Sequence, residues 1–139
     1  MPRPVSRRAV FVGAASLGAA VLGLTLSGCQ SNASTLVPED GERVSPSGQF
    51  TAEFASEGAG SDARVHPVIK DAGGTIVWAD DERYLVRAHP LGVAWQSDED
   101  VLWLLSSDIG TARVVQSNGV WVKDWEWTTL PPDIEALRG

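Results

Sequence analysis

Cys29 has the most distinctive chemistry in this sequence, because it is the only cysteine among 139 residues. A single cysteine has no partner for a disulfide within its own chain, so its thiol stays free, pairs with another molecule or is modified. Cys29 directly follows Leu26, Ser27 and Gly28, a short run that ends in small residues. This placement favours modification of the thiol.

The residues before Cys29 have the three-part layout of an export signal. Arg3, Arg7 and Arg8 make a basic start, and an uncharged run of 18 residues follows, from residue 9 to residue 26. Small residues then stand just before the expected cleavage site. An uncleaved membrane helix is one alternative, since 18 residues reach the lower limit for crossing a bilayer, although glycines and alanines dilute the run. An ordinary cleaved signal is the other.

The run Leu26-Ser27-Gly28-Cys29 resembles the lipobox of bacterial lipoproteins. The resemblance covers the first quarter of the chain. It implies a diacylglyceryl group on the Cys29 sulfur, cleavage between Gly28 and Cys29, and acylation of the new amine with a chain such as palmitate. Two or three acyl chains anchor a protein stably. The resemblance therefore predicts an exported protein on the outer face of the bacterial cytoplasmic membrane.

The start of the signal also resembles a twin-arginine export signal. Ser6, Arg7 and Arg8 match that pattern, and Val10 stands where phenylalanine is usual. Such signals direct the export of folded proteins. The ordinary secretory route is the alternative.

Other candidates for catalysis or metal binding are few. His66 and His89 each precede a proline, and neither has the spacing of a zinc site. The acidic turns at residues 80–82 and 98–100 lack the Asp-x-Asp-x-Asp-Gly order of a calcium loop, which favours solvated hairpin turns. No Gly-x-Ser-x-Gly motif is present. The sequence therefore assigns no catalytic residue, metal ligand or cofactor.

Three tryptophans near the C-terminus share strand parity. In an unbroken strand Trp121, Trp125 and Trp127 would line one face together with Lys123. An exposed face of this kind would stack on the sugar rings of wall glycan or bind an envelope protein. The alternative is that the face is buried. We favour the buried face, because a small domain needs its tryptophans in the core.

The charge of the chain bears on its partners. Without the three arginines of the signal, 8 basic side chains remain against 18 acidic ones, a net charge of about −10. Such a surface repels the phosphates of nucleic acids. We therefore expect no nucleic-acid partner.

The chain after the signal divides into a tether and one domain. Residues 29–48, which begin with the lipidated cysteine, are rich in serine, proline and glycine and break every periodicity. Such a segment has too little apolar surface to order itself, which predicts a disordered tether. Residues 49–139 carry all six tryptophans and predict a single β-domain.

Alternating and apolar runs separated by turn residues predict the strands of this domain. Residues 63–70 and 75–78 indicate a hairpin, in which Pro67 favours an edge position or a bulge. Residues 101–105 are apolar on both parities, which is typical of a central strand covered on both faces. Asn118-Gly119 predicts a tight hairpin turn, and Pro131-Pro132 predicts the start of a short terminal helix.

These elements predict an all-β fold, a single antiparallel meander in the form of a sandwich or a small open barrel. The segment Ser45-Pro46-Ser47-Gly48-Gln49-Phe50 resembles the strands of β-propeller blades, but a domain of this length holds only two blades, which cannot close a ring. A tryptophan-bearing hairpin follows that segment, and Trp95-x-x-Asp98 comes next. This order of features is similar to the order in small uncharacterised bacterial envelope proteins. That similarity implies no activity.

We therefore expect a non-enzymatic binding or interaction module, held outside the membrane, with an envelope protein or wall glycan as partner. Two alternatives remain open. One is an enzyme or accessory of cell-wall metabolism that uses carboxylates, and the other is an inhibitor or immunity-type lipoprotein that guards against a secreted toxin.

Overall fold

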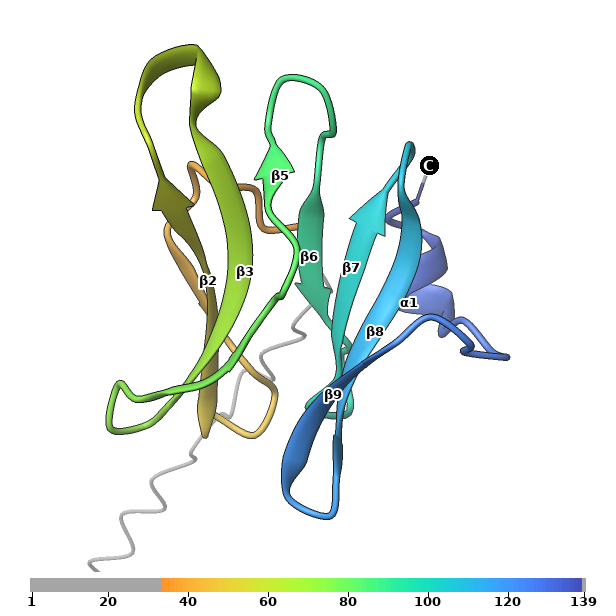
Figure 1. Cartoon of the computed structure of the whole chain (residues 1–139). Coiled ribbons are helices and arrows are strands. Elements are labelled where there is room, and N and C mark those ends of the chain that lie inside the picture. The colour runs from red at the N-terminus through yellow and green to blue at the C-terminus, as the bar shows by residue number, and fades with distance from the viewer. Residues whose placement is uncertain (1–33, 139) are drawn as a thin grey trace, which may run out of the picture.

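Residues 34–138 are described by a computed structural model and form two antiparallel β-sheets with very little helix (Figure 1). The first sheet holds β1 (Glu42–Val44), β2 (Phe50–Glu57), β3 (Arg64–Asp71) and β4 (Ile76–Ala79), with β5 (Tyr84–Leu85) also paired to β3. The second holds β6 (Gly92–Trp95), β7 (Leu102–Ser106), β8 (Gly110–Ser117) and β9 (Val120–Asp124) in chain order. A 3-10 helix, η1 (Gly60–Asp62), and a terminal helix, α1 (Pro132–Glu135), complete the fold. The prediction of an all-β antiparallel meander is confirmed, with two sheets in place of a barrel.

The main core lies between the two sheets. Every second residue of a strand points to the same face, so each strand contributes alternate side chains to this layer. Ala52, Val65 and Ile69 come from the first sheet, and Leu104 and Val114 come from the second. All five are buried.

A second, smaller core lies on the far side of the second sheet. Trp103 and Leu105 of β7 point away from the first sheet and pack with Ile134 of α1. Figure 1 shows α1 on this outer side. Because Leu102 and Leu104 of the same strand face the main core, β7 is covered on both faces, and the prediction made from residues 101–105 is confirmed.

The tether predicted over residues 29–48 is wrong for the part that the structure describes. Leu36 is fully buried, and it exchanges two backbone hydrogen bonds of 2.7 and 2.9 Å with Val93 of β6. After a turn, β1 pairs with β2. One buried leucine and backbone pairing to two exposed strand edges order this segment, although its composition is that of a linker. The signal and Cys29 lie outside the described residues.

This N-terminal segment closes one side of the sandwich. Leu36 extends the second sheet at β6, and a few residues later β1 extends the first sheet at β2. The indole Nε1 of Trp95 in β6 donates a hydrogen bond of 2.9 Å to the carbonyl oxygen of Arg43 in β1. The segment therefore joins the two sheets along this side.

Gly92, the first residue of β6, makes room for the N-terminal segment. A Cβ atom at this position would overlap the Cγ2 methyl of Thr35. We expect Gly92→Ala to lower the free energy of unfolding by about 1–3 kcal/mol, the usual cost of overpacking, in urea denaturation. Adding Thr35→Ala should restore most of the loss, because the next nearest atoms, Leu36 O and Thr35 Cβ, lie at ordinary distances of 3.6 and 3.8 Å.

The Thr35→Ala variant alone provides the control for this prediction. A double variant no more stable than Gly92→Ala alone would show that the clash lies elsewhere.

The sequence predicted an edge position or a bulge for Pro67. The edge position is wrong because β3 is an internal strand, and the register of β3 with β4 shifts two residues later, between Ile69 and Lys70. Its carbonyl oxygen accepts the backbone N–H of Asp80, at 3.0 Å, on the side of β3 that faces β4 and β5. Pro67 has no backbone N–H to donate on this side. None is needed there, because β4 has ended and β5 has not begun. The interruption between these two strands lets the proline stand inside the sheet.

Two local predictions are confirmed. Asn118 and Gly119 both have positive φ angles, 51° and 77°, as a two-residue turn between β8 and β9 requires. The predicted terminal helix begins at Pro132. Within residues 34–138, no helix is long and apolar enough to span a membrane.

Candidate functional site

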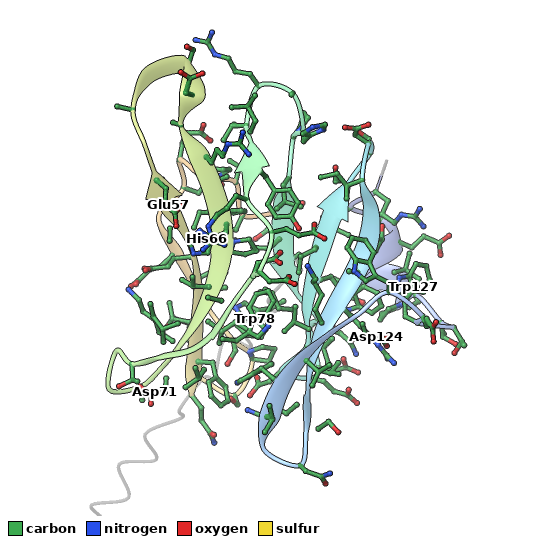
Figure 2. All side chains as sticks on the ribbon, viewed as in Figure 1. Glu57, His66, Asp71, Trp78, Asp124 and Trp127 are labelled. Atoms are coloured by element: carbon green, nitrogen blue, oxygen red, sulfur yellow. The ribbon has the colours of Figure 1, made fainter. Side chains whose placement is uncertain are left out.

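The three C-terminal tryptophans do not form one face, which corrects the hypothesis of a ligand face over Trp121, Trp125 and Trp127. Trp121 is buried in the main core, with its ring centroid 5.0 Å from that of Phe50. Trp127 packs against Trp103 at 5.6 Å in the outer core, on the side of the second sheet that Figure 2 shows turned away from the first. Trp125 is 41% exposed. Of the three, only Trp125 is exposed, and Trp127 is half-buried.

The strand breaks at Asp124, and this break separates the tryptophans. The Oδ1 atom of Asp124 accepts the backbone N–H of Glu126 at 2.8 Å, and its Oδ2 atom accepts the Nε–H of Arg113, also at 2.8 Å. A side chain that bonds the backbone two residues on makes a turn and ends a strand. The Glu126 N–H, and next the Arg113 guanidinium, hold the pKa of Asp124 below its usual value. An aspartate before Trp125-Glu126 was the sequence signal for this turn.

An ion cluster around the buried Asp80 side chain joins the other side of the sandwich. Lys123 of β9 reaches across to the segment after β4, where its Nζ lies 2.6 Å from Asp80 Oδ1, 3.0 Å from Asp81 Oδ1 and 3.8 Å from Glu82 Oε1. The hydroxyl of Tyr84 lies 2.9 Å from both Asp80 Oδ2 and Glu82 Oε2. The Asp80 side chain is fully buried, so the solvated turn predicted at residues 80–82 is wrong for Asp80.

The electrostatics of the ion cluster make it a structural link. Burial lowers the pKa of Lys123, but the hydrogen bonds to Asp80 and Asp81 outweigh burial and raise it overall. Burial, and then the hydrogen bond to Asp80, raise the pKa of Tyr84 well above its usual range. At neutral pH the amine is therefore protonated and the phenol is neutral. Neither group is available as a nucleophile or a general base.

The two histidines occupy unrelated places. His66 lies on β3 opposite Ala55 of β2, and Glu57 of β2 is close enough to influence its charge (both are labelled in Figure 2). It is buried, and among residues 34–138 its Nδ1 atom has no hydrogen-bond partner. Burial, and next the charge of Arg83, lower its pKa, so the ring is neutral at pH 7. His89 is exposed on the β5–β6 connection and pairs through Nδ1 with Asp108.

The acidic residues do not assemble a metal site in the described part of the chain. No group of three His, Cys, Asp or Glu side chains between residues 34 and 138 is placed to hold a metal ion. In the second acidic turn, Asp98 and Glu99 are exposed. Asp100 instead accepts the backbone N–H of Ser47 at 3.0 Å and fixes the turn between β1 and β2.

A groove of about 560 Å³ lies at the end of the sandwich that carries the β5–β6 and β7–β8 connections, the upper end in Figure 1. Its walls come from four separate segments of the chain. The apolar side chains among its lining residues include Val37, Val86, Leu91, Leu105 and Leu137. Sequence reasoning missed this site, because no local motif brings these segments together.

A second hollow of about 380 Å³ adjoins the groove. The two share Pro38, Glu39 and Val86 in their walls. The second hollow continues along η1 towards Ser61 and Arg87. We call these two neighbouring hollows together the depression, and the depression is the candidate functional site.

No protein-family model, curated protein or solved structure matches this sequence.

Proposed function

We propose that this protein is an exported lipoprotein, anchored to the outer face of the bacterial cytoplasmic membrane by acyl chains on Cys29, and that its β-sandwich is a non-enzymatic binding module. The groove carries the binding part of this proposal. Its volume of about 560 Å³ falls in the range of ligand sites, roughly 300–1,000 Å³. Its apolar walls are also typical of such sites.

The position of the groove relative to Cys29 connects the two parts of the proposal. Thr35 lines the groove and stands six residues after Cys29. An extended chain spans at most about 3.3–3.6 Å per residue, so the groove wall lies within roughly 20 Å of the modified sulfur. Since Leu36 is already part of the fold, the module works next to the lipid headgroups and not at the end of a long tether.

The lining of the groove favours binding over the chemistry of the alternative, an enzyme of cell-wall metabolism. Hydrolysis of a glycosidic bond by the usual route needs two carboxylates across a cleft. Among the described residues that line the groove, Glu39 is the only carboxylate. The ion cluster around Lys123 is committed to joining the sheets.

We expect Cys29→Ala to lose both the acyl mass and the cleavage after Gly28, because the thiol is the acceptor of the lipid and the processing step follows its modification. Membrane fractionation and intact-mass measurement check this. Ser27→Ala is the matched control, since it keeps a small residue before the cut and leaves the thiol in place.

Two results would overturn the anchoring proposal. Cleavage of the Cys29→Ala chain at an unchanged rate would indicate an ordinary signal. A wild-type protein that stays in the membrane without any acyl mass and without cleavage would indicate a membrane helix.

A further inference from the structure

The walls of the groove suit a hydrocarbon chain. Val37, Leu91 and Leu137 come from different parts of the chain and meet around one hollow. Val37 is 38% exposed, although it sits beside the core. Aromatic side chains are absent among the described lining residues, so the groove lacks the platform on which sugar rings stack. A flexible apolar ligand therefore fits it better than a glycan does.

The rim of this depression carries cations that the fold itself does not use. Arg138 lines the groove and Arg87 lines the adjoining hollow. Among residues 34–138 neither guanidinium forms an ion pair, whereas Lys70, Arg83 and Arg113 each pair with a carboxylate. Glu39 shares the rim but pairs with neither arginine. Arginine presents a fork of donors that matches the oxygens of a phosphate.

The end with the groove carries Arg87 and Arg138 beside the carboxylates of Glu39 and Asp108, whereas the opposite end of the sandwich exposes acidic side chains. Its β6–β7 connection exposes Asp98 and Glu99, and the β3–β4 turn begins at Asp71. Anionic headgroups repel the acidic side chains of the opposite end, and only the end with the groove offers them the arginines of the two hollows. The short distance from Thr35 to Cys29 keeps that end within reach of the bilayer.

From these three features we propose that the groove binds one acyl chain of an anionic phospholipid drawn from the anchoring membrane, with the phosphate held at the rim by Arg138 and Arg87. This inference rests on the proposed function, because the anchor supplies the proximity to the ligand. The occupant is a membrane lipid, separate from the acyl chains carried by Cys29 itself.

The test uses the full lipidated protein, purified from membranes in a mild detergent. Phosphatidylglycerol and phosphatidylcholine with the same acyl chains are added in equal amounts, and native mass spectrometry counts the lipids that remain bound. We expect one bound phosphatidylglycerol per protein, in addition to the mass of the covalent anchor. Phosphatidylglycerol should exceed phosphatidylcholine by on the order of tenfold, the preference that one charged contact provides.

Ser107→Trp and Ser117→Trp form the matched pair of variants. Both serines are exposed and lie near opposite ends of β8, but only Ser107 lines the groove. Ser107→Trp fills the groove and should reduce lipid retention on the order of tenfold, whereas Ser117→Trp should leave retention unchanged. Arg138→Gln should remove the preference for phosphatidylglycerol while the acyl chain still binds. Thermal unfolding of each variant verifies that it folds.

The outcomes separate this inference from the proposed function. A protein that carries its anchor mass but retains no phospholipid would overturn the groove proposal and leave the anchoring intact. A protein without anchor mass would overturn the proposed function itself. Three other results would overturn the groove proposal. The two tryptophan variants could lose lipid retention equally, the wild type could retain the two lipids equally, or the spectrum could show a dimer mass in place of a lipid adduct.

Discussion

Replacing Lys123 with methionine is expected to lower the free energy of unfolding by about 3–5 kcal/mol, because it leaves a buried carboxylate without its cation. The Asp80 side chain is fully buried, and Lys123 Nζ lies 2.6 Å from it. Methionine keeps the length of the lysine stem, so the change removes charge and hydrogen bonds with little loss of packing. Urea denaturation at neutral pH measures the effect.

Lys70→Met is the matched control, since it makes the same change in a partly exposed pair with Glu53. Such pairs contribute about 0–1 kcal/mol, so a small loss is expected there. Adding Asp80→Asn to Lys123→Met should recover part of the stability by removing the unpaired charge. If Lys123→Met costs no more than Lys70→Met, the cluster does not stabilise the link between the sheets.

The stabilisation from Lys123 also has a defined pH window. Its pKa is raised in the folded protein above its ordinary value of 10.5. A group with a raised pKa contributes its full stabilisation below the pKa of the unfolded chain and loses it as the pH rises through the folded pKa. The difference between wild type and Lys123→Met should therefore be constant around neutral pH and, on the alkaline side, should shrink above about pH 10.5.

The second large effect is expected at Trp103, where replacement by alanine should lower the free energy of unfolding by about 3–5 kcal/mol. Trp103 is 1% exposed and joins β7 to the C-terminal segment. Its indole Nε1 donates to Gln96 Oε1 at 3.2 Å, and its ring packs edge-on against Trp127. The variant leaves a cavity at the centre of the outer core, so α1 should detach before the sandwich unfolds.

Trp125→Ala is the control for this prediction, because Trp125 is exposed and its ring centroid lies 5.6 Å from the Lys123 ammonium at the surface. A loss below about 1 kcal/mol is expected there, as is usual for a surface position. Limited proteolysis of the C-terminal segment reports the detachment of α1. A Trp103→Ala variant as stable as Trp125→Ala would show that the outer core is not packed as described.

The parts of the fold that depend on neighbouring residues were predictable from the sequence. The apolar run at residues 101–105 identified the central strand, since both of its faces are buried. The pair Asn118-Gly119 identified a hairpin, because few other residues adopt two successive positive φ angles. Both features are local, and tertiary contacts do not override them.

The errors arose where one distant contact decides the outcome. The composition of residues 29–48 predicted a tether, but the pairing of Leu36 with Val93 orders the described part of that segment. No local sequence pattern predicts a partner 57 residues away. Likewise, the sequence predicted Asp80 to be a solvated surface residue, because its cation, Lys123, belongs to the other sheet. The groove has the same origin, since its walls meet only in the folded chain.

The groove also contains both ends of the described chain. Thr35 and Arg138, separated by more than a hundred residues in sequence, line the same hollow. The groove therefore forms only after residues 137 and 138 have been synthesised and have packed beside the second sheet. A chain that ends before residue 137 would keep the Cys29 motif proposed to carry the anchor, but it would lack part of the groove wall. On the proposed function, ligand binding would therefore report that residues 137 and 138 are in place.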